Sequence, residues 1–144
     1  MFENVNITTN GGGVDIRGTS VFNSGSVTVN STSTSTRHLF YVGAKDGEAK
    51  GHLTINGGEF KLNPTNLTRK GYYICADGEG AKVIVNGGSF DKPSTRPVYE
   101  AGIGELSGGE VIIYGGTFAF DPISWVAEGY EAVLVDGLWT VSAK

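Results

Sequence analysis

The acidic residues are the side chains whose type and spacing could do chemistry in this chain of 144 residues. A glycoside hydrolase needs two carboxyl groups facing each other across a sugar, and a polysaccharide lyase needs a calcium-binding cluster of acids beside a base. Asp15 and Arg17 are two residues apart, which places them on one face of a strand. The other acidic candidates in the repeated part of the chain are Glu59, Asp77, Glu79, Asp91 and Glu100.

These acids are better explained as surface residues. Asp77 and Glu79 lie in a glycine-rich corner, D-G-E-G, where aspartate is a common turn residue. Glu59 corresponds to Ser89 and Thr117 in two related segments, as expected for an outward position that accepts any polar residue. No carboxylate pair recurs in a way that builds a groove, so we predict no catalytic residue and a protein that is not an enzyme.

Metal and cofactor sites are not predicted. His38 and His52 are the only histidines, and neither belongs to an H-x-x-H or H-E-x-x-H pattern. The segment G-G-G-V-D-I-R-G at 11–18 is faintly similar to a calcium-binding nonapeptide, but it occurs once and that mechanism needs stacked copies. Cys75 is the single cysteine, so it can form no disulfide within the chain, and we expect a small buried strand residue.

Charge and hydropathy exclude two classes of partner. Eleven basic and fifteen acidic residues give a net charge of −4, and the basic residues are scattered, so we expect no nucleic acid partner. No apolar run approaches ~18 residues, so we expect no membrane insertion. The start, M-F-E-N-V-N-I, has neither a basic region nor an apolar core, so we expect no secretory signal.

Three related segments organise the chain: L-T-I-N-G-G-E-F at 53–60, V-I-V-N-G-G-S-F at 83–90 and V-I-I-Y-G-G-T-F at 111–118. Each contains a short alternating strand, a double-glycine corner and one more inward residue. Such a unit is too small to bury its own apolar face, so the copies must stack on one another. The predicted structural residues are Gly57, Gly58, Gly87, Gly88, Gly115, Gly116, Phe60, Phe90 and Phe118.

Earlier segments extend the series with less similarity. Aligning V-T-V at 27–29 and V-N-I at 5–7 with the three copies gives steps of 22, 26, 30 and 28 residues. The predicted inward columns are Val5, Val27, Leu53, Val83 and Val111, and then Ile7, Val29, Ile55, Val85 and Ile113.

A second family of strands precedes the first, at 38–43, 71–76 and 97–102. Within it, we expect Phe40 and one tyrosine of the pair Tyr72 and Tyr73 to lie in the core. Paired strands joined by corners too short for a helix predict an all-β protein, a parallel β-helix (solenoid) of about five short turns. An antiparallel sandwich is the competing interpretation, because its turn spacing also occurs here.

Residues 119–144 differ from the repeats at 1–118. Asp121 and Pro122 indicate the start of one helical turn, and two alternating runs around Asp136-Gly137 predict a β-hairpin. We predict that this turn and hairpin form a C-terminal cap, with Trp125 and Trp139 closing the open end of the repeats. At the N-terminus only Phe2 is available for such a role.

Contact residues are expected on loops and on outward-facing aromatic positions. Polar excursions at 31–37, 61–70 and 91–97 follow three of the repeats, and solenoids often carry recognition on such loops. Tyr114 replaces the asparagine found at 56 and 86, which favours a contact role. The candidate binding residues are Tyr72, Tyr99, Tyr114, Arg37, Arg69 and Arg96.

The G-G-x-F corners and the ending W-V-A-E-G-Y-E-A-V-L-V-D-G-L-W-T-V resemble the β-helix repeat segments of bacteriophage virion proteins and of surface or adhesin-like proteins of gut bacteria. The resemblance covers roughly residues 50–144. It implies a right-handed solenoid used for display or attachment, and it carries over no catalytic residue. It also implies a homo-oligomer, with a trimer as the expectation.

The leading hypothesis is a non-enzymatic structural and binding module of a phage virion: a capsid decoration, head-fibre, tail-fibre or other tail-associated protein made in the host cytoplasm. Its expected partners are other virion proteins or a host-surface glycan. One alternative is a fragment of an adhesin that binds glycans at the bacterial cell surface. Another is a small polysaccharide lyase or glycosidase.

Overall fold

A computed structural model describes residues 1–144 except 11, 32–36, 44–49, 65–70 and 92–101. The described residues are almost entirely strands and corners, with one short 3-10 turn, η1 (Ile123–Trp125). They include no helix long and apolar enough to cross a membrane. The protein is therefore all-β, as the sequence predicts.

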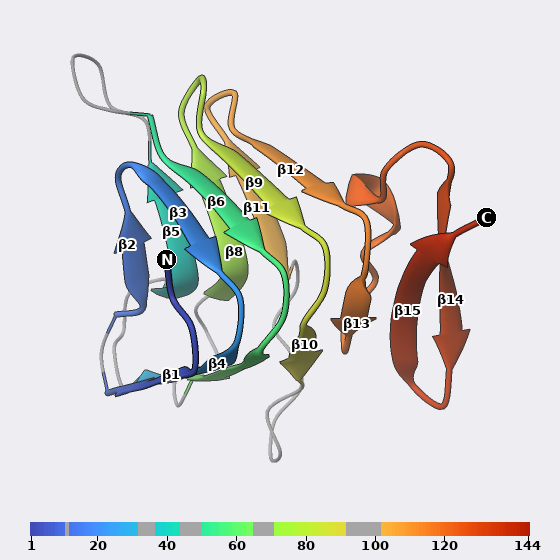
Figure 1. The fold of residues 1–144 in the computed structure, drawn as a ribbon, viewed down its shortest axis with the longest axis horizontal. Coiled ribbons are helices and arrows are strands. Elements are labelled where there is room, and N and C mark those ends of the chain that lie inside the picture. The colour runs from blue at the N-terminus through green and yellow to red at the C-terminus, as the bar shows by residue number, and fades with distance from the viewer. Residues whose placement is uncertain (11, 32–36, 44–49, 65–70, 92–101) are drawn as a thin grey trace.

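The strands lie in three sheets (Figure 1). The seven-stranded long sheet has the order β1 (Val5–Thr9), β4 (Gly25–Ser31), β7 (Glu59–Pro64), β10 (Ser89–Asp91), β13 (Gly116–Phe118), β15 (Leu138–Ala143), β14 (Tyr130–Val135). The β8 sheet has the order β11 (Ile103–Leu106), β8 (Gly71–Asp77), β5 (Arg37–Gly43), β2 (Val14–Ile16). The β9 sheet has the order β12 (Glu110–Ile113), β9 (Lys82–Val85), β6 (His52–Ile55), β3 (Thr19–Phe22).

The chain passes through the three sheets in a fixed order. From β5 onwards it runs through β5, β6 and β7, then β8, β9 and β10, then β11, β12 and β13. We call one such pass a rung, and each rung pairs in parallel with the preceding one in all three sheets. Stacked parallel sheets of this kind are consistent with a β-solenoid. The competing antiparallel sandwich is wrong.

The three similar segments stack as predicted. Leu53 pairs with Val83, and Val83 pairs with Val111. Phe60, Phe90 and Phe118 follow one another in the long sheet, with ring centroids 4.8 and 4.9 Å apart, and all three are fully buried. One column of aromatic rings therefore runs through the core.

The second glycine of each corner makes this column possible. Gly88 has a φ of +108°, in the left-handed region that favours glycine, and a Cβ there would lie 2.9 Å from the ring of Phe60. Gly58 and Gly116 have φ values of +119° and +109°. The second position of the corner thus needs glycine for two reasons: its φ is positive, and a Cβ would clash with the neighbouring phenylalanine ring.

The predicted alignment of the first two segments is wrong. Ser20 of β3 is the residue that pairs with Leu53, while Val27 pairs with Phe60 and Ile7 pairs with Val27. The segment S-V-F-N-S-G-S-V at 20–27 is therefore the missing copy of the repeat. Ser20 stands where the other copies have an aliphatic residue and Val27 where they have phenylalanine, so its likeness to them is faint. Val5 and Val27 accordingly do not lie in the column of Leu53, nor Ile7 and Val29 in that of Ile55.

The second strand family is confirmed for two members, and the strand that pairs next to them begins after the predicted third member. Phe40 pairs with Ile74, and both are buried. In the next rung the strand of the β8 sheet is Ile103–Leu106, because Ile103 pairs with Ile74. Most of the predicted strand at 97–102 lies outside the described residues. The V-D-I of β2, from the segment with a faint calcium-loop pattern, pairs with β5 as an ordinary strand.

Residues 119–144 form the predicted turn and hairpin. β14 and β15 are antiparallel around Asp136 and Gly137, whose φ values of 51° and 80° suit a two-residue hairpin loop. β15 continues the long sheet by pairing antiparallel with β13, which places Trp139 opposite Phe118. In η1, the indole N–H of Trp125 donates to Glu105 at 3.0 Å.

Candidate binding surface

The predicted loop contacts mostly lie outside the described residues. This applies to Tyr99, Arg69 and Arg96, and of Arg37 only its backbone pairing with Gly71 can be stated. The strands that flank the three excursions are described. β4, β7 and β10 are neighbours in the long sheet, and β5, β8 and β11 are neighbours in the β8 sheet. The three excursions therefore leave from adjacent strands and return to adjacent strands (Figure 1).

The strongest grouping of polar and aromatic side chains lies on the outer surface of the β8 sheet. We call it the aromatic face, and it consists of His38, Tyr41, Tyr72, Asp15, Arg17 and Asp77. Strand alternation places Tyr41 there, because its neighbours in β5, Phe40 and Val42, are fully buried in the core. Alternation does not place His38 and Tyr72, which are two residues before the buried Phe40 and Ile74, and their position beside Tyr41 is given by the ring contacts. Tyr41 pairs with Asp15 of β2 on one side and with Cys75 of β8 on the other.

The rings of the aromatic face form one continuous row. The His38 ring stacks on Tyr72 at 5.2 Å and on Tyr41 at 5.7 Å between centroids. The guanidinium of Arg17 lies over the Tyr41 ring, 5.6 Å from its centroid, as in a cation–π contact. Tyr41, His38 and Tyr72 are half-buried, so each ring keeps part of its surface in contact with solvent.

Two glycines leave room for these rings. A Cβ at Gly104 would lie 3.2 Å from atoms of the Tyr72 ring, so this ring lies flat over β11. At Gly43 a Cβ would lie 3.0 Å from the Tyr41 ring and 3.4 Å from the Arg17 guanidinium. A side chain at either position would displace the row.

Hydrogen bonds hold the ends of the row. The Arg17 guanidinium donates to both oxygens of Asp15, at 2.9 and 3.2 Å, so the predicted sharing of one face is correct. The Tyr41 hydroxyl donates to Asp77 at 2.6 Å, and this bond, together with burial, raises the pKa of Tyr41 to about 12. Asp77 ends β8 and accepts this bond, so it does more than form the turn to which the sequence assigned it.

Cys75 lies beneath this surface and is not available for chemistry. It is fully buried, as predicted, between Tyr41 and Gly104 in the same column. Burial, and to a smaller degree Asp77, raises the pKa of the thiol to about 11. The thiolate, which would be the nucleophile, is thus strongly disfavoured at neutral pH. The prediction for the tyrosine pair is also confirmed, since Tyr73 is buried while Tyr72 lies on the aromatic face.

Tyr114 ends a ladder of asparagines. The amide of Asn56 donates to Asn23 at 2.8 Å, and the amide of Asn86 donates to Asn56 at 2.9 Å. In the next rung the same position is Tyr114, whose ring meets Tyr130 of the hairpin edge to edge at 5.2 Å. Tyr114 remains 36% exposed, so its described contact is with the C-terminal hairpin and part of its surface is open.

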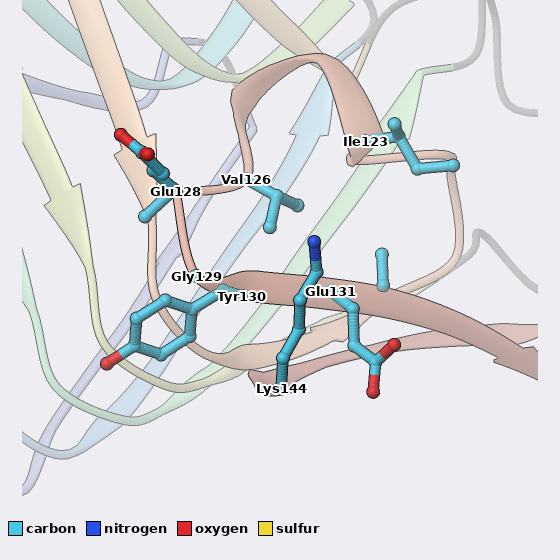
Figure 2. A pocket seen from close by; sticks show the side chains of 9 residues that line it. Ile123, Val126, Glu128, Gly129, Tyr130, Glu131 and Lys144 are labelled. Atoms are coloured by element: carbon cyan, nitrogen blue, oxygen red, sulfur yellow. The ribbon is translucent and has the colours of Figure 1, made fainter.

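A hollow with a volume of about 410 Å³ lies beside this hairpin (Figure 2). Val126 and Ile123 contribute apolar groups, and Glu128, Glu131 and Lys144 contribute charges. In Figure 2 the carboxylates of Glu128 and Glu131 point away from each other. The hollow therefore does not offer the two facing carboxylates that glycoside hydrolysis needs.

The remaining acidic candidates are dispersed. Glu59 pairs with Ser89, as the repeat alignment predicts, and is exposed. Asp91 accepts a hydrogen bond from the Ser89 hydroxyl at 2.9 Å, Glu79 is exposed, and Glu100 lies outside the described residues. Among the residues that the structure describes, no three His, Cys, Asp or Glu side chains are grouped so that they could hold a metal ion.

Comparisons of the chain with family models, with characterised proteins and with solved structures found no match. The features of the chain that indicate a function are therefore the aromatic face and the scaffold beneath it.

Proposed function

We propose that this chain is a non-enzymatic structural and binding module, a right-handed parallel β-helix with a C-terminal hairpin cap. We further propose that it is a component of a bacteriophage particle, such as a capsid decoration, head-fibre or tail-associated protein. The likeness of its corners and ending to virion repeat segments supports the particle, and its stacked architecture supports the display role.

The aromatic face is the observation that carries the binding role. Its rings come from neighbouring rungs, and backbone pairing between β2, β5 and β8 sets their spacing. A ligand that stacks on these rings meets a surface formed before binding, so little conformational entropy is lost on binding. Such a surface suits a module that presents a contact and performs no reaction.

A host-surface glycan is the ligand class that this face suits. The apolar C–H faces of a sugar can stack on exposed tyrosine rings, while its hydroxyl groups need nearby donors and acceptors. Asp15 and Arg17 supply both kinds of group beside Tyr41, and both side chains are substantially exposed, at 56% and 40%. An extended polysaccharide could lie along the row of rings and contact several strands.

The test is binding of the purified protein to surface polysaccharides of bacteria, measured by glycan array and then by calorimetry. We expect Tyr72→Ala to weaken binding about tenfold, equivalent to ~1.4 kcal/mol, because it removes a stacking ring. Tyr114→Ala is the matched control and should leave binding unchanged, since Tyr114 follows β12 of the β9 sheet and its ring contacts Tyr130 of the hairpin. Absence of binding across the panel, or equal losses in both variants, would contradict the role of the aromatic face.

The adhesin is the second candidate, because a glycan-binding aromatic face serves an exported surface protein equally well. The two functions differ in where the protein is found. Mass spectrometry of purified phage particles should detect it if it is a virion protein, whereas the cell-wall fraction should contain it if it is an adhesin. Cleavage of a bound polysaccharide during the array experiment would instead favour the lyase or glycosidase.

A further inference from the structure

β14 presents an open edge of the long sheet. Among the described strands it is the last of that sheet, beyond β15, at the C-terminal end in Figure 1. Its residues Val133, Leu134 and Val135 are 46%, 53% and 58% exposed. Natural proteins usually protect such an edge with lysine, proline or a bulge, yet between Tyr130 and Val135 the only charged residue is Glu131. The edge is thus apolar and unprotected.

The backbone groups that face outward from β14 can be assigned. The N–H of Lys144 donates to the carbonyl of Gly129 at 3.0 Å, so residue 129 is a hydrogen-bonded position opposite β15. Antiparallel partners alternate between hydrogen-bonded and non-hydrogen-bonded pairs, so Glu131 and Val133 also bond to β15. Ala132 and Leu134 therefore direct their N–H and C=O groups toward the open edge.

We propose that β14 pairs with β14 of a second copy of this chain, antiparallel, around a two-fold axis that passes beside Val133. Ala132 of each copy then faces Leu134 of the other, and their outward groups form about four hydrogen bonds. The two Val133 side chains face each other on the axis. This arrangement covers the three exposed apolar residues of the strand, and it goes beyond the proposed function.

The charges and the hydrogen bonds favour this register. With the axis beside Val133, Glu131 faces Val135 of the second copy, and the two Glu131 residues lie four positions, about 13 Å, apart along the strands. That separation exceeds the screening length of about 8 Å at physiological salt. A register centred on Ala132 would need the N–H of Tyr130, which already donates to Ala127 at 3.1 Å, and would bring the two glutamates closer.

A second copy also explains why the edge can remain apolar. A two-fold contact uses the same surface on both partners and closes after two copies, whereas pairing β14 with β1 of another copy would build an open filament. In the closed pair the two long sheets join into one, and the assembly carries two aromatic faces. Two linked faces raise the avidity for a repeating ligand without any new contact to it. The contact predicts even-numbered assemblies, in contrast to the trimer that the family resemblance implies.

Cysteine cross-linking tests the register in the full chain carrying Cys75→Ser. Val133→Cys places two thiols in a directly opposed non-hydrogen-bonded pair, with Cα atoms about 4.5 Å apart, inside the range of a disulfide. We expect this variant to give a covalent dimer under oxidised glutathione. Glu131→Cys is the matched control on the same face and should remain uncross-linked. Equal cross-linking of both variants, or cross-linking of Glu131→Cys alone, would overturn the proposal.

Sedimentation equilibrium of the chain without added cysteines gives the second readout. We expect dimers that Val133→Lys weakens at least about tenfold, because it places two like charges on the axis. Thr140→Lys, on the exposed surface of the adjacent strand β15, should dimerise normally and shows that a new lysine on this hairpin is tolerated. The proposal would be overturned by a wild-type chain that is monomeric at about 100 µM, or that forms trimers or open filaments. This outcome does not depend on whether the variants fold.

Discussion

The central rungs and the C-terminal hairpin both contribute strands to the long sheet, yet their apolar residues differ in burial. Phe60 and Phe90 are fully buried between their neighbours above and below, whereas Leu134 and Val135 are more than half exposed. All four residues are strongly apolar strand residues. Burial in this protein therefore depends on what packs against a residue, and hydrophobicity alone does not secure it.

Truncating one residue in each region should give the largest difference. Phe90→Ala removes a ring that stacks on both Phe60 and Phe118, so we expect it to lower the free energy of unfolding by about 3–5 kcal/mol. Leu134→Ala should lower it by about 0.5 kcal/mol or less, because that side chain is already mostly in water. Urea unfolding at low protein concentration measures both values without a contribution from association. Similar losses in the two variants would show that the comparison is wrong.

The asparagine ladder gives a smaller difference of the same kind. Asn56 both donates to Asn23 and accepts from Asn86, so Asn56→Ala breaks two hydrogen bonds between rungs. Because the ladder is exposed and water can replace the lost partners, we expect a loss of about 1 kcal/mol. Thr140→Ala on the hairpin is the control and should change stability by no more than about 0.5 kcal/mol. An unchanged urea midpoint for Asn56→Ala would mean that the asparagine ladder forms when the rungs stack but does not stabilise the stack.

The same comparison explains which parts of the fold could be predicted from the sequence. The three G-G-x-F segments were recognisable because each must fit the same space between rungs, so their residues are nearly the same. The hairpin was recognisable because Asp136-Gly137 determines it locally. The pass through β2, β3 and β4, which contains Ser20 and Val27, was not, since the described residues that pair with its outer side are those of β1 and Phe2, and it can accept other side chains there. Asn23, which continues the asparagine ladder, was the available signal for it.

The aromatic face could be predicted only in part for a related reason. Tyr72 was a candidate because it is an aromatic residue in a strand. Its stacking on His38, which also stacks on Tyr41, depends on the register between β5 and β8. In the sequence these two strands are separated by β6, β7 and a polar excursion. Asp77 was assigned to the turn because its neighbours are glycines, and its bond to Tyr41 becomes visible only when the two strands are aligned. Contacts between rungs therefore exceed what local patterns can predict.

A further effect, confined to alkaline pH, concerns groups held between rungs that titrate there. Folding raises the pKa of Tyr41 from 10.0 to about 12, chiefly through its bond to Asp77, so the folded state keeps the proton that the unfolded state loses. The stability that this difference contributes is complete below pH 10 and is lost as the pH rises to about 12. Tyr41→Phe should remove this part of the alkaline decline.

Cys75 contributes an earlier and separate decline, because folding raises its pKa from 9.0 to about 11. Urea unfolding at several values of pH should therefore show that Tyr41→Phe retains the loss between pH 9 and 11 and is less sensitive than the wild-type chain above it. Cys75→Ala should show the converse. If both variants followed the wild-type curve, the bond between Tyr41 and Asp77 would not couple neighbouring rungs to folding, and burial of Cys75 would not either. These groups between rungs would then contribute no more to stability in alkali than the mostly exposed side chains of the hairpin.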